Sequence, residues 1–440
     1  MRTTSALVAV LVLATTTIPV AVLAANARNA AGDRSAVALA TLPEIPLGET
    51  LNGLQAGATD NDRGFLLGTL GSDIWRAPTD PPDEFYMVGD RGPNGQIRVD
   101  GVNRRTFPVP GWTPLIAHVR VEGDALTLLD LIPVTGTSGA WVGGLPNIPG
   151  FDEVPYDYTA QEVLWYDASG LDTEGLVRMR NGDFWLVDEY SPSLVHLAPT
   201  GRVITRYVPV GLSLQGADYP VVEALPPIYG KRKINRGFEA VTMSADERTL
   251  YLVLQSPLLN PDAATGNPSR QTRILAWDVA SARPVAEYVY RLEDATEFVG
   301  EPTPPDEMKL SGLAWVNPTT LLVLERTDFV AKVYQVDLGQ AMNILDTPWS
   351  DPDTTPTLES LADPAAVGVR PLPKRLLLDL SSVDGMPDKI EGLAVVDAMT
   401  LAVCNDNDSD IGDFDAQGNN LGTGARSHVL YVRLDQPLPL

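Results

Sequence analysis

The sequence predicts an all-β fold, a β-propeller of four-stranded blades closed by pairing of the N- and C-terminal strands. Three observations lead to this prediction. A frame of two apolar, strand-like runs joined by a short turn recurs along the chain, for example in residues 173–191, 310–328 and 389–408. Further strand-like runs follow most copies of this frame, which is typical of a fold made of similar modules. The chain also contains 37 Gly and 37 Pro among 440 residues, as expected for many short strands joined by turns.

Each copy of the frame has polar residues at the open end of its two strands. The copies run from Glu174 to Asp188, from Glu239 to Gln255, from Ser311 to Glu325 and from Glu391 to Asn405. A further copy is expected near the start, from Asn52 to Asp90, with a long insertion between its strands. The frames therefore predict a set of inner hairpins, one for each blade.

The runs that follow the frames supply the outer strands. They are residues 114–134, 193–210, 272–292, 331–338 with 374–380, and 427–434. The last module is one strand short, and the orphan strand at 35–45 can fill the gap and close the ring. This count predicts five blades, and a sixth stays open because residues 135–172 form a long unassigned insertion. A β-sandwich would explain the alternating strands but not the repeated frame.

The first 24 residues are typical of an export signal. Arg2 precedes a mostly apolar run, and small residues for cleavage follow it. A retained membrane anchor is the alternative, which the short span and three consecutive threonines disfavour. No other segment approaches the roughly 20 apolar residues of a membrane helix. We therefore expect residues 25–440 to form a single exported domain, periplasmic or extracellular, without membrane contact once the signal is removed.

Charge and cysteine content narrow the choice of partners. The formal net charge of −25 repels nucleic acid and anionic membranes. Cys404 is the single cysteine, so no internal disulfide can form. A small-molecule substrate is the partner that this composition leaves open.

The frames predict an acidic ring at one mouth of the central channel. The two inner strands of a blade are antiparallel, so the start of one lies beside the end of the other. The expected ring consists of Asp90, Glu174, Asp188, Glu189, Glu239, Glu325, Glu391, Asn405 and Asp406. Two carboxylates about 5 Å apart repel by roughly 3 kcal/mol at an effective dielectric constant of about 20. Such a ring needs a counter-charge, or some of its members must hold protons.

A hard cation is the counter-charge that the sequence favours. Ca²⁺ suits flexible cages of carboxylate and amide oxygens, whereas zinc and copper sites need His or Cys ligands that are missing here. The predicted ligands are Asp90, Glu174, Asp188, Glu239, Glu325, Glu391, Asn405 and Asp406. A purely structural network of acids and arginines is the alternative. A second, looser calcium loop or a solvated acidic turn is expected at 405–422.

Basic residues beside the ring are candidates for substrate binding. Residues 229–240 hold the strongest basic cluster and lead into the strand with Glu239. Cationic side chains there can hold phosphate or carboxylate groups. The predicted set is Arg91, Lys231, Arg232, Lys233, Arg236 and Arg326. A loop that is merely solvated is the alternative.

Several motifs resemble one known family. They are "DRGPNG" (90–95), the long run beginning "EGLVRMRNGDFWLVDEYS" (174–191), "NRGFEAVTMSADERTLYLV" (235–253), and "IEGLAVV" with "NDND" near the end. Together they look like the phytase-like esterase family of β-propeller proteins, over roughly residues 45–435. The chain is similar, more distantly, to calcium-dependent propeller lactonases and arylesterases.

The resemblance implies a hydrolase of ester or phosphoester bonds. No G-x-S-x-G nucleophile motif is present, so metal-assisted hydrolysis is the expected mechanism. Glu174, Glu239 and Glu391 would then act as ligands or as the general base. A binding or scaffold propeller that holds a structural calcium ion without catalysis is the alternative function.

Overall fold

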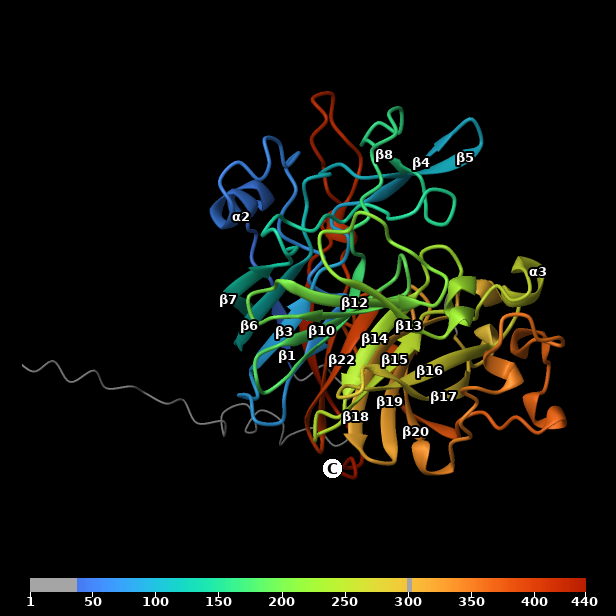
Figure 1. Cartoon of the computed structure of the whole chain (residues 1–440). Helices are drawn as coiled ribbons and strands as arrows, with labels where there is room; N and C mark the ends of the chain where they lie inside the picture. Colours follow the sequence, from blue (N-terminus) through green and yellow to red (C-terminus); the bar gives the residue numbers. More distant parts are fainter. Residues whose placement is uncertain (1–37, 299–302) are drawn as a thin grey trace, which may run out of the picture.

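The structure is a computed structural model that describes residues 38–298 and 303–440 (Figure 1). The predicted export signal at residues 1–24 lies outside the described residues. Most of the described regular structure is β-strand, as the sequence predicts. The helices are α2 (Leu47–Leu54), α3 (Ala263–Gly266) and the short 3-10 turns Pro227–Lys231, Ala295–Glu297, Pro305–Glu307, Leu338–Gln340, Pro348–Ser350, Leu358–Ser360, Pro364–Val367, Leu380–Ser382 and Asp408–Asp410.

Three large sheets lie in the middle of the chain. Each begins with a hairpin of the repeated frame and continues outward in chain order. The first contains β9 (Thr173–Arg178), β10 (Phe184–Asp188), β11 (Ser193–Leu197), β12 (Val203–Pro209) and β13 (Val221–Leu225). The second contains β14 (Phe238–Met243), β15 (Thr249–Leu254), β16 (Gln271–Asp278) and β17 (Arg283–Arg291). The third contains β18 (Lys309–Asn317), β19 (Thr320–Arg326), β20 (Ala331–Asp337) and β21 (Lys374–Asp379).

The two ends of the chain share an eight-stranded sheet. Its first half is β2 (Asp73–Trp75), β3 (Glu84–Val88), β6 (Leu115–Glu122) and β7 (Ala125–Pro133), and its second half is β1 (Ala38–Thr41), β24 (His428–Arg433), β23 (Thr400–Asn405) and β22 (Ile390–Asp397). Only the pair Thr41 and Ala125 joins the halves, so they are separate four-stranded modules. β1 pairs with β24 along its whole length. It thus supplies the strand that the last module lacks in the sequence analysis.

The inner strands pack side by side in a ring. β2 contacts β9, and the series continues through β14, β18 and β22 back to β2. Apolar side chains from neighbouring sheets interdigitate between the modules, as in the cluster that joins Val187 of β10 to Val241 of β14. The structure therefore confirms the all-β, propeller-like prediction.

The predicted first copy of the frame is wrong in its inner strand. The segment at Asn52 lies in helix α2, and the inner strand of that module is β2. Leu47 and Leu51 are buried while Glu49, midway between them, is exposed, whereas a strand would place all three on one face. Residues 135–172 contain β8 (Pro155–Tyr156), which pairs with the hairpin of β4 (Gly95–Val99) and β5 (Val102–Thr106) in a small sheet apart from the larger ones (Figure 1).

Small residues allow the inner strands to approach one another closely. A Cβ added at Gly175 would lie 2.9 Å from the Cα of Ala240 on the next inner strand. One added at Gly392 would lie 2.7 Å from the backbone nitrogen of Ile74. The glycine that follows the frame glutamate is thus required by the packing of neighbouring modules.

Replacing Gly175 with alanine is expected to destabilise the protein by about 1–3 kcal/mol, because the added methyl group overpacks the contact between β9 and β14. Gly230→Ala is the matched control, since a Cβ there has nothing within 4 Å. Urea denaturation of both variants measures the difference. Equal stability of the two variants would contradict the close approach.

Candidate metal and substrate cavity at the mouth of the ring

A cavity of about 330 Å³ lies at one mouth of the ring of inner strands. Charged side chains make up most of its wall. The acids are Asp90, Glu153, Glu174, Glu189, Glu239, Glu307, Glu391, Asp406 and Asp408. The basic residues are Arg91, Arg105, Lys233, Arg236, Lys309, Arg326 and Lys389. The cavity therefore brings together most of the acidic ring that the sequence predicts.

β-Bulges aim the inner-strand residues into this cavity. The register between the two inner strands shifts at Glu174, at Glu239, at Ser311 and at Glu391. A bulged residue has no partner in the ladder, so its side chain can turn away from the sheet. The same local irregularity thus recurs in four modules at the position where the sequence has Glu or Ser.

The bulges also explain why three predicted ligands lie elsewhere. Because the register shifts by one, Asp188 lies opposite Thr173 and not opposite Glu174. Successive side chains of a strand alternate between its two faces. In three modules the residue one position later therefore lines the cavity, namely Glu189, Arg326 and Asp406, and Asp90 and Gln255 line it in the other two.

Asp188, Glu325 and Asn405 have structural partners away from the cavity. Asp188 forms a fully buried ion pair with Arg206 and accepts a hydrogen bond from Ser193. Glu325 lies 2.8 Å from the ammonium of Lys374. Asn405 accepts a hydrogen bond from the backbone amide of His428, at 2.8 Å. We therefore do not count these three residues among the candidate metal ligands of the cavity.

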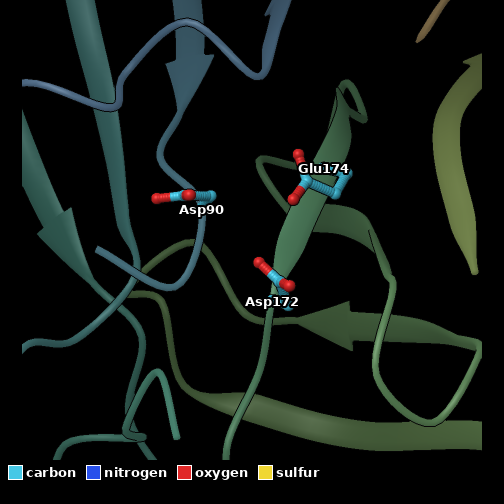
Figure 2. Close-up of side chains that lie close together, drawn as sticks. All are labelled: Asp90, Asp172 and Glu174. Atoms are coloured by element: carbon cyan, nitrogen blue, oxygen red, sulfur yellow. The ribbon is translucent and has the colours of Figure 1, made fainter. Parts of the chain in front are cut away.

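Three carboxylates have the spacing of a metal site. Ligand atoms of Asp90, Asp172 and Glu174 all lie within 4.8 Å of one another, and all three residues are buried (Figure 2). Asp172 was missed in the sequence. Its position two residues before Glu174 could have indicated it, because side chains two residues apart in an extended segment lie on the same face.

The acidic side chains of the cavity are crowded. Burial, together with the neighbouring carboxylates of Asp172 and Glu239, raises the pKa of Glu174 well above its usual value. Burial and the charge of Asp406 raise the pKa of Asp90 in the same way. Burial also raises the pKa of Glu391 to about 7, against the opposing charge of Arg326. Without a cation, burial and mutual repulsion therefore favour the protonated forms of these acids.

Glu239 and Glu391 are better neutralised than the group of three. The side-chain amide of Gln255 donates hydrogen bonds to Glu239 at 2.7 Å and to Glu189 at 2.8 Å. Arg326 forms an ion pair with Glu391. The Asp90–Asp172–Glu174 group has Arg91, whose guanidinium is 3.2 Å from an oxygen of Asp172. The three carboxylates around Glu174 thus have a single guanidinium, that of Arg91, as the cation paired with them among the described residues.

The predicted basic residues divide into two sets. Arg91, Lys233, Arg236 and Arg326 line the cavity, as expected. Arg232 is instead buried in an ion pair with Asp152, and Lys231 is exposed outside the cavity wall. Lys309 and Lys389 were missed, although each lies two residues before a bulged residue, as Asp172 does.

The acidic segment at 405–422 uses its carboxylates within its own loops. Asp415 accepts hydrogen bonds from the amides of Gln417 at 2.9 Å and Asn419 at 2.8 Å. One oxygen of Asp410 accepts from the amides of Thr423, Gly424 and Ala425. These bonds favour the solvated turn of the two alternatives for this segment.

Fold and cavity together define a propeller-like protein with a buried, charged site at one mouth of its channel. The chain belongs to the phytase-like family described as "Esterase-like activity of phytase", whose model matches residues 69–409. This membership agrees with the resemblance found in the sequence and supports a hydrolase.

The name of one curated relative says nothing about the reaction. An uncharacterized secreted protein of Arthroderma benhamiae is 28% identical over 272 residues, which are 53% of this chain and 53% of that protein. The chain thus spans about half the length of the curated relative that it matches.

No helix in residues 38–298 and 303–440 has the length and apolarity needed to cross a bilayer.

Solved structures resemble the chain only distantly. A calcium-binding protein, regucalcin, of Agrobacterium tumefaciens is 11% identical with a TM-score of 0.34, covering 86% of this chain and 95% of that one. Hydrazine synthase of Kuenenia stuttgartiensis is 10% identical with a TM-score of 0.33, covering 80% of each chain. Similarity at this level assigns neither a fold nor a function.

Proposed function

We propose that this protein is an exported, calcium-dependent hydrolase of ester or phosphoester bonds that acts in the charged cavity. The buried group of Asp90, Asp172 and Glu174 is the observation that carries the proposal. Membership of the phytase-like family supports hydrolysis. The proposal includes an export signal at 1–24, a periplasmic or extracellular location, and a single domain at 25–440 with five blades closed by β1 and β24.

The donor set of the cavity fits calcium. All three grouped residues offer carboxylate oxygens, which hard cations prefer. Glu239, Glu391 and Asp406 line the same cavity and can complete the coordination. When bound, calcium would polarise the ester or phosphoryl oxygen of the substrate.

Other residues of the cavity wall would supply the general base and the groups that bind the substrate. A general base works best when its pKa is close to the working pH, and the pKa of Glu391 is raised to about 7. We assign Glu391 as the base that takes a proton from the attacking water, with Glu239 as the second candidate. Arg91, Lys233, Arg236 and Arg326 would hold the anionic part of the substrate.

Turnover of two simple substrates tests this proposal. Hydrolysis of p-nitrophenyl acetate or p-nitrophenyl phosphate is expected with calcium, is lost after chelation and returns when calcium is added back. Bound calcium without hydrolysis of either substrate would instead support the alternative, a scaffold protein with a structural ion.

Stability of the calcium-free protein is expected to fall as the pH rises from about 5.5 to about 8. Cavity acids with raised pKa bind more protons in the folded than in the unfolded state over this window, so protonation favours folding at the lower pH. Calcium must displace those protons, so it should stabilise the protein more at the higher pH. Melting temperatures with and without calcium at both pH values measure the effect. A calcium-free protein that melts higher at the alkaline value would contradict it.

A further inference from the structure

A group of cations lies on the wall of the cavity formed by β14, β18 and β19. Lys309 begins β18, Arg326 ends β19, and Arg236 lies two residues before β14. Their side chains are 15%, 2% and 10% exposed, respectively. All three line the cavity that Asp90 and Glu174 also line.

Two of the acids that pair with these cations are partly exposed, whereas Glu391, a partner of Arg326, is buried in the cavity wall. Asp328 is 2.8 Å from the ammonium of Lys309 and 3.1 Å from the guanidinium of Arg326, so two cations share one carboxylate. The side chain of Asp328 is 44% exposed and is not part of the cavity wall. Glu307, the partner of Arg236, is 46% exposed. Lys309 and Arg236 therefore line the cavity, while their partners Asp328 and Glu307 can be hydrated.

The cations crowd one another as the acids do. Burial, followed by the charges of Arg326 and Arg236, lowers the pKa of Lys309 below its usual value. An anion bound among the three would relieve this repulsion. The ammonium of Lys309 and the planar guanidinium groups together suit a tetrahedral oxyanion with two negative charges.

We infer that Lys309, Arg236 and Arg326 form an anion subsite in the cavity, and that Lys309 selects substrates that carry a phosphate group over neutral esters. The substrate class depends on the proposed hydrolase function. The subsite itself can be tested by binding alone.

Calorimetric titration with inorganic phosphate, at calcium levels too low for precipitation, tests the subsite. Lys309→Met is expected to weaken phosphate binding about tenfold, the usual loss when one charged hydrogen-bonding group is removed. Lys309→Arg keeps the charge and should retain most of the affinity. Lys231→Met is the matched control, because Lys231 is exposed outside the cavity, and its phosphate affinity should equal that of the wild type.

Three results would overturn the subsite: no phosphate binding to the wild type, equal affinity in Lys309→Met, or equal losses in Lys309→Met and Lys231→Met. If Lys309→Met does not fold, Arg236→Gln replaces it. This second variant removes the charge from the same group, and the same tenfold loss is expected.

Turnover tests the selectivity. In Lys309→Met, kcat/KM for p-nitrophenyl phosphate should fall about tenfold while that for p-nitrophenyl acetate stays within about twofold. Equal losses for both substrates would overturn the selective role of Lys309. If the wild type hydrolyses neither substrate, the proposed function fails, and the phosphate titration still decides whether the subsite exists.

Discussion

Glu174→Gln is expected to release most of the bound calcium and to lower hydrolysis by about 100-fold, because a strong ligand is lost together with the Lewis acid that it holds. A carboxylate oxygen of Glu174 lies within 4.8 Å of carboxylate oxygens of Asp90 and Asp172. The substitution keeps the shape of the side chain and removes one charge from a crowded acidic group. Without a metal, the same substitution should therefore leave stability unchanged or improve it.

Elemental analysis and turnover of the purified variant measure these two effects. The same losses are expected in Asp172→Asn. Glu239→Gln and Glu391→Gln should release less calcium, since Gln255 and Arg326 already bind those carboxylates. Glu391→Gln should still lower turnover, because it removes the proposed general base. Ser311→Ala is the matched control, because Ser311 occupies the equivalent bulge in β18. Full metal content and full turnover in Glu174→Gln would show that the site lies elsewhere.

Removal of calcium is expected to lower the melting temperature. An ion that binds only the folded state stabilises it by about 2.7 kcal/mol when its free concentration is 100 times its Kd. The ion would also offset the burial and the mutual repulsion that raise the pKa of Asp90 and of Glu174. The protein should therefore melt several degrees lower after chelation and recover when calcium is restored.

Magnesium is the matched comparison for this experiment. It demands a near-ideal octahedral site and loses its water reluctantly, so it should restore less stability than calcium does. Unchanged melting after chelation, together with no metal in the untreated protein, would contradict a bound ion.

Much of the fold could be predicted from local patterns. The hairpins at 173–191 and 389–408 were recognisable because apolar runs of strand length flank a turn, and both form strand pairs. The terminal strand near residue 38 was recognisable because the last module lacked a partner. The strand predicted at Asn52 was wrong because the leucines of this segment have the spacing of a helix. We gave the repeated frame more weight than this spacing.

Five acidic residues of the cavity wall could be predicted from the repeated frames alone. Glu174, Glu239 and Glu391, with Asp90 and Asp406, were expected at one mouth of the channel, and all five line the cavity. The reason is that antiparallel hairpins arranged around one axis must bring their open ends together.

The packing of the modules sets which of two neighbouring residues faces the cavity and which acids form a group. A bulge at each frame position shifts the register by one, so Glu189 and Asp406 replace Asp188 and Asn405 in the wall. The approach of Asp90 to Asp172 joins two modules that are 82 positions apart in the sequence (172 − 90). Bulges and contacts between modules depend on how closely the inner strands pack, and local periodicity carries no information about that packing.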